Sequence, residues 1–251
     1  MIPSYSIVVA VDPRTVDQLK LTWPTWRRKP GILDVPMHVI VDAGLLPRDA
    51  SYQGILALDH PNVTYHNWNF PWLVFPDMTQ RERMLSAFVY FAPLLVDTDY
   101  WLKLDVDSVA TDDKPWVDEA WFARNPVLVA RPWSYTKPGE WIDTLQAWSR
   151  SNLLTKHYPP LDWPPHDETR QVYRHSRIIS QQCFVQTEWS RRVAAYLQPR
   201  LPVPSQDTIH WYLAELQRLP IVKARFPGWT NRCTRRGLEE AVAGAIAEML
   251  R

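Results

Sequence analysis

The sequence predicts an α/β protein with a mixed, mostly parallel sheet flanked by helices. The first observation is a strand–helix–strand pattern within residues 7–41, which is typical of a pair of parallel strands. The second is that strand and helix patterns keep alternating up to residue 107. The third is size: 251 residues, 46% of them hydrophobic and 22% charged, suffice for one large α/β core.

The first half of the chain opens with a continuous apolar run at residues 7–11, typical of a strand covered on both faces. Asp12 and Pro13 predict the start of a helix, with Asp12 as the N-cap and Pro13 as the first helical residue. Pro24 is expected to bend or end that helix. Further strands are predicted at residues 37–41, 62–68 and 100–106.

A capping box from Thr79 to Glu82 predicts another helix, which ends near Pro93. The second half of the chain is less regular. Thr187 is expected to cap a helix, and Ser205 to Asp207 to open the next one. The remaining predictions are strands at residues 127–130, 178–186 and 221–225, helices at 138–151 and 238–250, and a long ordered loop at 155–177.

Two aspartates, Asp105 and Asp107, stand where the strand at residues 100–106 gives way to a loop. A strand that ends in Asp-x-Asp directs two hard oxygen ligands toward one point, at the sheet edge where open α/β sheets bind ligands. Such carboxylates suit Mg²⁺ or Mn²⁺ together with substrate phosphates. The alternative is a chance pair of loop acids. A second Asp-x-Asp, Asp97 and Asp99, precedes the strand and is interpreted as turn chemistry.

These motifs, in this order, resemble the GT-A-type nucleotide-sugar glycosyltransferases that carry a DxD motif. The resemblance covers most of the chain. It is carried by residues 7–14 and 41–44, a helix with Arg81 and Arg83, residues 102–107, residues 178–185 and the acid at a helix start, residues 205–207. It implies a Rossmann-like sheet with a smaller second sheet near the acceptor side. The chain would be a single domain, 1–251, with a nucleotide-sugar-binding half, 1–110, and an acceptor-binding half, 111–251.

The resemblance also implies donor-side roles for particular residues. Asp105 and Asp107 would bind Mn²⁺ or Mg²⁺ on the donor diphosphate, and His210 would be a further metal ligand. The others implied are Val11, Asp12 and Arg14 for the nucleoside, Asp42 for base or ribose, Arg81 for diphosphate or ribose, and Gln181 and Gln182 for the sugar, where the family usually carries glycines. For Arg81 the alternative is a solvated arginine, and for His210 a structural role.

Asp207 matches the position where inverting members of the family keep a general base, which deprotonates the acceptor hydroxyl. The alternative reading is ordinary capping at a helix N-terminus. Acceptor binding is expected from aromatic and arginine side chains in and around the long loop. The candidates are Trp133, Trp163, Arg174 and Arg177.

Arginines interleaved with aromatic residues also hold flipped or single-stranded bases. The acceptor is therefore open between a glycan, a small molecule and hydroxymethylated bases of viral-type DNA. The net charge of +1 argues modestly against a nucleic-acid partner. The sequence shows no signal peptide, no membrane-spanning run and no cysteine framework, so we expect a cytoplasmic protein.

The sequence thus favours a metal-dependent glycosyltransferase that uses a nucleotide-diphospho-sugar, with a uridine diphosphate sugar as the first choice. A non-catalytic carbohydrate- or nucleotide-binding protein on the same fold is the second hypothesis. A metal-dependent nucleotidyltransferase ranks third, because such enzymes commonly carry a glycine-rich phosphate loop and this chain has 7 glycines and no such loop. The sugar and the inverting or retaining outcome are left open.

Overall fold

The computed structural model describes residues 1–42, 56–68, 77–132, 178–196, 206–231 and 235–250. Its strands are β1 Tyr5–Val11, β2 Met37–Val41, β3 Val63–Asn67, β4 Tyr100–Leu104, β5 Ser108–Ala110, β6 Leu128–Pro132, β7 Ile178–Gln186, β8 Ile221–Lys223 and β9 Trp229–Asn231. Its helices are α1 Val16–Trp26, α4 Gln80–Ser86, the π-helix η2 Ala87–Phe91, α5 Ala92–Leu95, the 3₁₀-helix η3 Glu119–Phe122, α9 Thr187–Tyr196, α10 Gln206–Leu216 and α11 Arg235–Met249.

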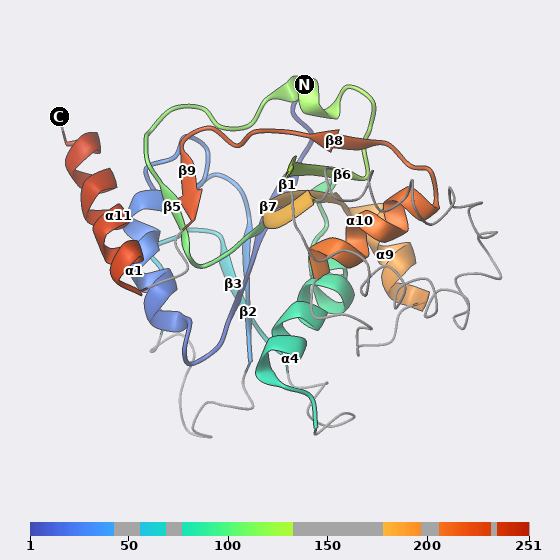
Figure 1. Cartoon of the computed structure of the whole chain (residues 1–251), viewed down its shortest axis with the longest axis horizontal. Helices are drawn as coiled ribbons and strands as arrows, with labels where there is room; N and C mark the ends of the chain where they lie inside the picture. The colour runs from blue at the N-terminus through green and yellow to red at the C-terminus, as the bar shows by residue number, and fades with distance from the viewer. Residues whose placement is uncertain (43–55, 69–76, 133–177, 197–205, 232–234, 251) are drawn as a thin grey trace, which may run out of the picture.

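A seven-stranded mixed sheet in the order β3-β2-β1-β4-β7-β6-β8 forms the centre of the fold (Figure 1). The pairs β1–β2, β2–β3, β1–β4 and β6–β8 are parallel, and β7 is antiparallel to both of its neighbours. A second, two-stranded antiparallel sheet joins β5 to β9. The predicted α/β class, the mostly parallel mixed sheet and the smaller second sheet are confirmed.

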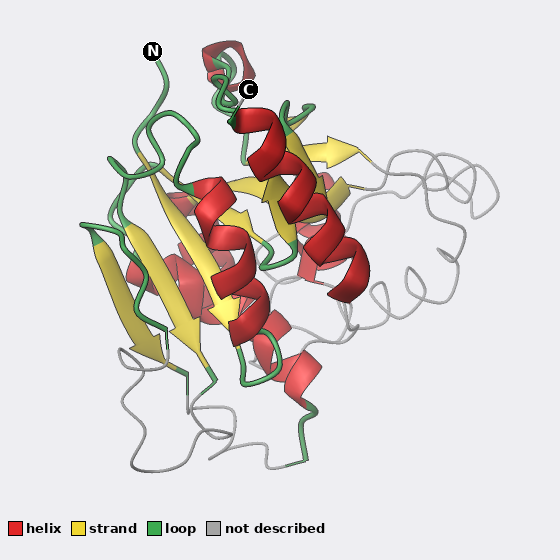
Figure 2. Cartoon of the chain, turned by 90° about the vertical axis from the view of Figure 1, so that its left-hand side faces the viewer, coloured by secondary structure: helices red, strands yellow, loops and turns green. Residues whose placement is uncertain are grey.

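Helices cover both faces of the large sheet, and each face buries its own apolar core. On one face, α1 directs its own Trp23 and Trp26 into the core, and α11 lies beside α1 and against β5 of the small sheet (Figure 2). On the other face, η2, α9 and α10 enclose Phe88, Trp101 and Tyr212. Among the described tryptophans all but Trp121 are buried, so core filling is their main use.

Two details of the predicted helices are wrong. Helix α1 begins at Val16 after the N-cap residue Thr15, not at Pro13. Pro24 lies inside it and does not end it, since the helix runs to Trp26. Thr187 is the first residue of α9, but its buried hydroxyl has no hydrogen-bond partner among the described residues, so it is no side-chain cap. The capping box at Thr79 is confirmed: the Thr79 hydroxyl accepts from the Glu82 amide, and the Glu82 carboxylate accepts from the Thr79 amide.

The helix that starts at Gln80 changes register before Pro93. In η2 the amide of Ala92 donates to the carbonyl of Ala87, five residues earlier. Pro93 has no amide hydrogen, and its ring would collide with the carbonyl of Val89 in a continuous α-helix. A wider π turn avoids that collision, which explains why the helix continues to Leu95 instead of ending at the proline.

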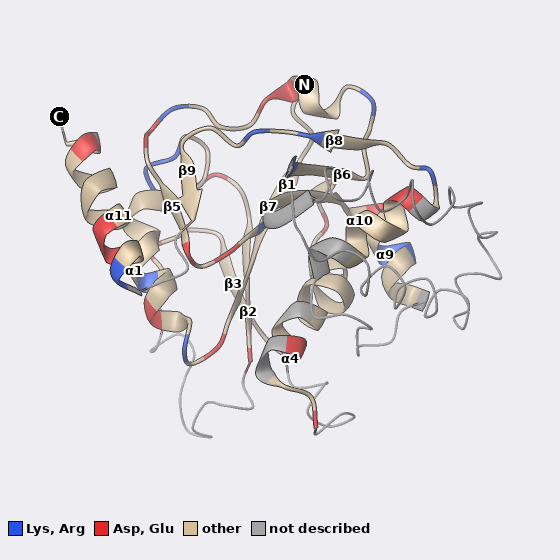
Figure 3. Ribbon diagram, in the orientation of Figure 1, with Lys and Arg blue, Asp and Glu red and all other residues tan. Residues whose placement is uncertain are grey.

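Charges of both signs are interspersed over the described elements (Figure 3), in keeping with the net charge of +1. None of the helices in the described part of the chain combines the length and the apolar character needed to cross a bilayer. Of the predicted elements, the helix at 138–151 and the loop at 155–177 lie outside the described residues.

A buried lysine joins α1 to the second sheet. The Lys29 ammonium bonds the Asp112 carboxylate and donates to the carbonyl oxygen of Lys114 at 3.3 Å. Gly228, which precedes β9, adopts φ +71°, and a Cβ there would lie 2.3 Å from both the Lys29 Nζ and an Asp112 carboxylate oxygen. This contact therefore requires a glycine.

We expect Gly228→Ala to lower the free energy of unfolding by about 1–3 kcal/mol, because the new methyl group combines a left-handed backbone with a collision at a buried ion pair. Gly244→Ala in α11 is the matched control, since a Cβ there meets nothing within 4 Å and alanine favours helices. Urea unfolding measures both variants. Equal stability of the two would contradict the assigned role of Gly228.

Candidate functional site at the carboxyl edge of the parallel strands

The strand order reverses at β1, because the chain runs from β1 outward through β2 to β3 and then returns to place β4 on the other side of β1. At such a switch point the carboxyl ends of neighbouring parallel strands form the ligand-binding edge of an α/β sheet. Val11 at the end of β1 pairs with Val41 at the end of β2, and Val8 pairs with Lys103. The edge therefore gathers the residues that follow β1, β2 and β4.

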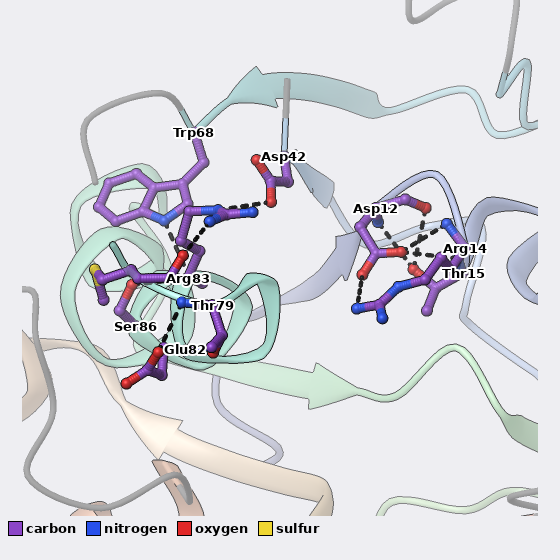
Figure 4. Close-up of polar contacts among 10 residues, drawn as sticks. Asp12, Arg14, Thr15, Asp42, Trp68, Thr79, Glu82, Arg83 and Ser86 are labelled. Atoms are coloured by element: carbon purple, nitrogen blue, oxygen red, sulfur yellow. Dashed lines mark hydrogen bonds and ion pairs between the residues drawn. The ribbon is translucent and has the colours of Figure 1, made fainter. Parts of the chain in front are cut away.

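Asp12 follows β1 and shapes its own loop. Its buried carboxylate accepts hydrogen bonds from the backbone amides of Arg14 at 2.7 Å and Thr15 at 3.0 Å, while the Asp12 amide donates to the Thr15 hydroxyl at 2.8 Å (Figure 4). These bonds form the turn that delays the start of α1. The Arg14 guanidinium stands 3.7 Å from the other Asp12 oxygen and is largely exposed, so it is the group that this loop presents to solvent.

Asp42 follows β2 and forms a fully buried ion pair with Arg83 of α4, 3.1 Å from Nε to Oδ2 (Figure 4). The same guanidinium donates to the carbonyl oxygen of Met78 at 2.5 Å. The Arg83 carbonyl accepts from the Trp68 indole at 3.1 Å. The first turn of α4 is thereby fixed to the end of β2.

The sequence motifs point to Arg81 as the donor-binding arginine of this helix and do not identify Arg83. Arg81 lies in the first turn of α4, but its side chain is outside the described residues. Arg83 lies on the same helical face as the buried Ser86 and Ala87, three and four residues on. That spacing is the sequence signal that Arg83 turns inward.

Asp105 and Asp107 lie on the turn between β4 and β5, where the Ser108 amide donates to the Asp105 carbonyl at 2.9 Å. The Asp105 carboxylate is 30% exposed. It accepts a hydrogen bond from the buried ammonium group of Lys103. The lysine also lies 4.8 Å from the Phe88 ring centroid. Lys103 was likewise not singled out, although an i, i+2 spacing in a strand places it on the same face as Asp105.

Asp107 contacts the second sheet. Its carboxylate accepts from the Asn231 amide nitrogen at 3.3 Å, and the same nitrogen donates to the Ser108 hydroxyl at 2.7 Å. Burial raises the pKa of Asp107, against the Asn231 hydrogen bond and the charge of Lys103, which both lower that pKa. No sequence signal identified Asn231, because it reaches Asp107 only through the pairing of β9 with β5.

The residues around Asp107 fit a hard divalent cation. The side-chain oxygen of Asn231 is buried without a hydrogen-bond partner among the described residues. The carboxylates of Asp105 and Asp107 are oxygen donors of the kind that Mg²⁺ and Mn²⁺ accept, and Asn231 could add a third oxygen by turning its NH2 group away from Asp107. A nearby cation would favour the ionised form of Asp107.

His210, the third metal ligand expected from the resemblance, lies in an aromatic environment. It is buried on α10 with its ring 5.7 Å from that of Trp101 and 6.0 Å from that of Trp189. Burial, helped by the charge of Lys103, lowers its pKa to about 3, so the imidazole is neutral at physiological pH. Within the described ranges, no three His, Cys, Asp or Glu side chains gather closely enough to hold a metal ion.

The remaining predicted residues divide between β7, α10 and undescribed segments. Gln182 of β7 pairs with Leu104, directly before Asp105, and its buried amide has no hydrogen-bond partner among the described residues. The side chains of Gln181 and Asp207 are outside the description, although their backbones lie in β7 and in the first turn of α10. The predicted acceptor residues Trp133, Trp163, Arg174 and Arg177 all lie outside the described residues.

No protein-family model matches the sequence, and no curated protein matches it either. Solved structures do match the fold. The galactosyltransferase LgtC, in complex with donor and acceptor sugar analogs, aligns over 96% of this chain and 95% of its own, with a TM-score of 0.51 and 12% identity. The mannosyltransferase PcManGT from Pyrobaculum calidifontis, in complex with GDP-Man and Mn²⁺, aligns over 95% of this chain and 59% of its own, with a TM-score of 0.52 and 10% identity.

A protein from Bacillus anthracis that is assigned as a glucose-1-phosphate thymidylyltransferase, in complex with sucrose, aligns over 98% of this chain and 96% of its own. Its TM-score is 0.53 and its identity 13%. At identities this low, the likeness shows a shared fold and no more. The chain therefore has the Rossmann-like GT-A fold expected from the sequence.

The buried pair of Asp42 and Arg83 gives a test of the site's architecture. We expect Asp42→Asn to lower the free energy of unfolding by about 3–5 kcal/mol, because it replaces the buried carboxylate that pairs with the Arg83 guanidinium by a neutral amide. The double variant Asp42→Leu with Arg83→Met removes both charges and should lose less. Asp59→Asn is the control, because its ion pair with Arg27 is exposed and should be worth less than about 1 kcal/mol. Guanidinium unfolding curves that show equal losses for Asp42→Asn and Asp59→Asn would refute the structural role of the pair.

Proposed function

We propose that the protein is a metal-dependent glycosyltransferase that transfers a sugar from a nucleotide-diphospho-sugar to a hydroxyl acceptor. The observation that carries the proposal is the position of Asp105 and Asp107, directly after the strand that neighbours β1 at the switch point of a GT-A sheet. The structural likeness to LgtC and PcManGT supports it, since both are glycosyltransferases on this fold.

In this proposal Asp105 and Asp107 hold Mn²⁺ or Mg²⁺, and Asn231 adds its amide oxygen once the side chain turns its NH2 group away from Asp107. When bound, the cation supplies Lewis-acid chemistry, because it neutralises charge that develops on the departing nucleoside diphosphate. The residues around Val11, with Asp12 shaping the loop and Arg14 exposed on it, contact the nucleoside.

The other donor contacts come from the neighbouring elements. Asp42, oriented by Arg83, lies close to base or ribose, and Arg81 reaches the diphosphate or ribose from the first turn of α4. Gln181 and Gln182 offer amide groups to the sugar. Gln182 is suited to this because its buried amide has no other partner among the described residues.

On the acceptor side, Asp207 at the start of α10 acts as the general base if the reaction inverts the anomeric carbon. Trp133, Trp163, Arg174 and Arg177 bind the acceptor. We keep a uridine diphosphate sugar as the favoured donor, a glycan or small molecule as the favoured acceptor, a modified DNA base as the alternative acceptor, and the cytoplasm as the location.

One observation favours a second candidate, a nucleotidyltransferase: the Bacillus anthracis protein assigned as a thymidylyltransferase shares the fold over nearly its whole length. The loop after β1 argues against it, because Asp12, Pro13, Arg14 and Thr15 contain none of the glycines of a phosphate loop. The two reactions release different products. Glycosyl transfer or donor hydrolysis yields a nucleoside diphosphate, whereas nucleotidyl transfer from a nucleoside triphosphate to a sugar phosphate yields pyrophosphate.

The experiment that separates them incubates the protein with Mn²⁺ and uridine, guanosine, cytidine or thymidine diphospho-sugars, and in parallel with nucleoside triphosphates and glucose-1-phosphate. We expect metal-dependent release of a nucleoside diphosphate from one of the diphospho-sugars, even without acceptor. Pyrophosphate release alone would assign the second function. Donor binding without either product would indicate the non-catalytic binding protein.

Asp107→Ala should reduce that nucleoside diphosphate release by about two orders of magnitude or more, because the loss of a metal ligand removes several kcal/mol of transition-state stabilisation. Metal-dependent donor binding, measured by calorimetry, should be lost as well, while the circular dichroism spectrum stays unchanged. Asp97→Ala is the matched control, since it alters the other Asp-x-Asp, where Asp97 is exposed and pairs with Arg191. Full activity of Asp107→Ala would exclude the metal role.

For Asp207 we expect the conservative change to Asn to lower kcat by about 10²- to 10⁴-fold with little effect on donor affinity, as for a general base. Glu215→Gln, at an exposed position of the same helix, should leave both quantities unchanged. Steady-state kinetics and donor titration provide the two numbers. A parallel fall in donor affinity and melting temperature would instead mean that Asp207 caps α10.

A further inference from the structure

The Asp-x-Asp turn already contains a positive charge of its own. The Lys103 side chain is only 3% exposed and bonds the Asp105 carboxylate. Its charge also lowers the pKa of Asp107 and of His210, so its field extends over the whole turn and into the adjoining core. An ammonium group is costly to bury without a counter-charge, which ties Lys103 to Asp105.

The charges at the turn decide how strongly it attracts a divalent cation. The carboxylates of Asp105 and Asp107, both ionised, contribute −2, and the Lys103 ammonium brings the sum over these three side chains to −1. A cation that shares the Asp105 carboxylate with Lys103 is also repelled by the ammonium at short range, where the surrounding core screens charges weakly. The turn therefore attracts a divalent cation less strongly than its two carboxylates suggest.

A nucleoside diphosphate changes this balance. Its phosphate oxygens carry several negative charges, and a hard divalent cation takes phosphate oxygens readily as ligands. The negative charge of phosphate oxygens near the turn would offset the positive charges of both the cation and the Lys103 ammonium. Cation and nucleotide then stabilise one another, and this coupling acts equally on both affinities.

We propose that Lys103 is a positioning residue that makes binding of the divalent cation depend on the nucleoside diphosphate. The inference rests on the proposed function, because it assumes that the Asp-x-Asp turn binds a cation with the donor. It adds that this chain holds the cation weakly by itself and tightly in the presence of the nucleotide, and that Lys103 is the cause.

The test titrates Mn²⁺ into the wild-type protein and into Lys103→Met, each with and without uridine or guanosine diphosphate, and follows free Mn²⁺ by electron paramagnetic resonance. In the absence of nucleotide, Lys103→Met should bind Mn²⁺ about tenfold more tightly than the wild type. The factor by which nucleotide improves Mn²⁺ affinity should fall by about the same amount in the variant.

Lys29→Met is the matched control, because Lys29 is also a buried lysine paired with an aspartate, Asp112, outside the Asp-x-Asp turn. It should leave the Mn²⁺ affinity unchanged. Lys103→Arg keeps the charge and should behave like the wild type. Near-ultraviolet circular dichroism checks that each variant is folded, and Lys103→Gln replaces Lys103→Met if the latter is not.

Equal or weaker Mn²⁺ binding by the folded, uncharged Lys103 variant overturns the inference and leaves the proposed function standing. A wild-type protein and a variant that both bind no Mn²⁺ with either nucleotide overturn this inference, and the same result with cytidine and thymidine diphosphates overturns the proposed function as well. Tighter binding by Lys103→Met and by Lys29→Met alike would trace the effect to net charge and would also overturn the role of Lys103.

Discussion

The parallel pairing of β1 with both β2 and β4 is the constraint on which the rest of the structure depends. It brings the ends of the three strands to one edge, so that Asp12, Asp42 and Asp105 follow neighbouring strands although they are far apart in the sequence. Because the strand order reverses at β1, the helices that connect these strands cover opposite faces and leave the edge to the loops.

That edge concentrates acids, and the fold compensates most of them locally. Asp42 pairs with Arg83 from α4, Asp105 pairs with Lys103 from its own strand, and Asp12 accepts two backbone amides of its own loop. Asp107 is compensated least: its pKa is raised by burial, and its partner is a neutral amide, Asn231. The electrostatics of the edge therefore single out the Asp107 end of the turn as the place where an added cation gains most.

Much of the local structure could be predicted from the sequence, because its signals lie within a few residues. The capping box at Thr79 is a contact between residues three apart. Strand β7 has the predicted bounds, Ile178–Gln186, because a helix begins directly after it at Thr187. Local signals also misled. Asp12 and Pro13 have the composition of a helix start, but the Asp12 carboxylate binds the amides of a turn and delays the helix to Val16. The inward position of Arg83 follows from its helical face, which it shares with the buried Ser86 and Ala87, three and four residues on.

What the sequence determined by itself is the α/β class, the order of the strands that form the large sheet, and the position of Asp105 and Asp107 after a buried strand. The periodic spacing of hydrophobic residues and the turn-forming residues between elements encode these features locally. Only the tertiary structure decided which side chains meet: Arg83 with Asp42, and Asn231 with Asp107. The physical reason is that β9 pairs with β5 across more than a hundred residues, and no local pattern specifies a partner at that separation.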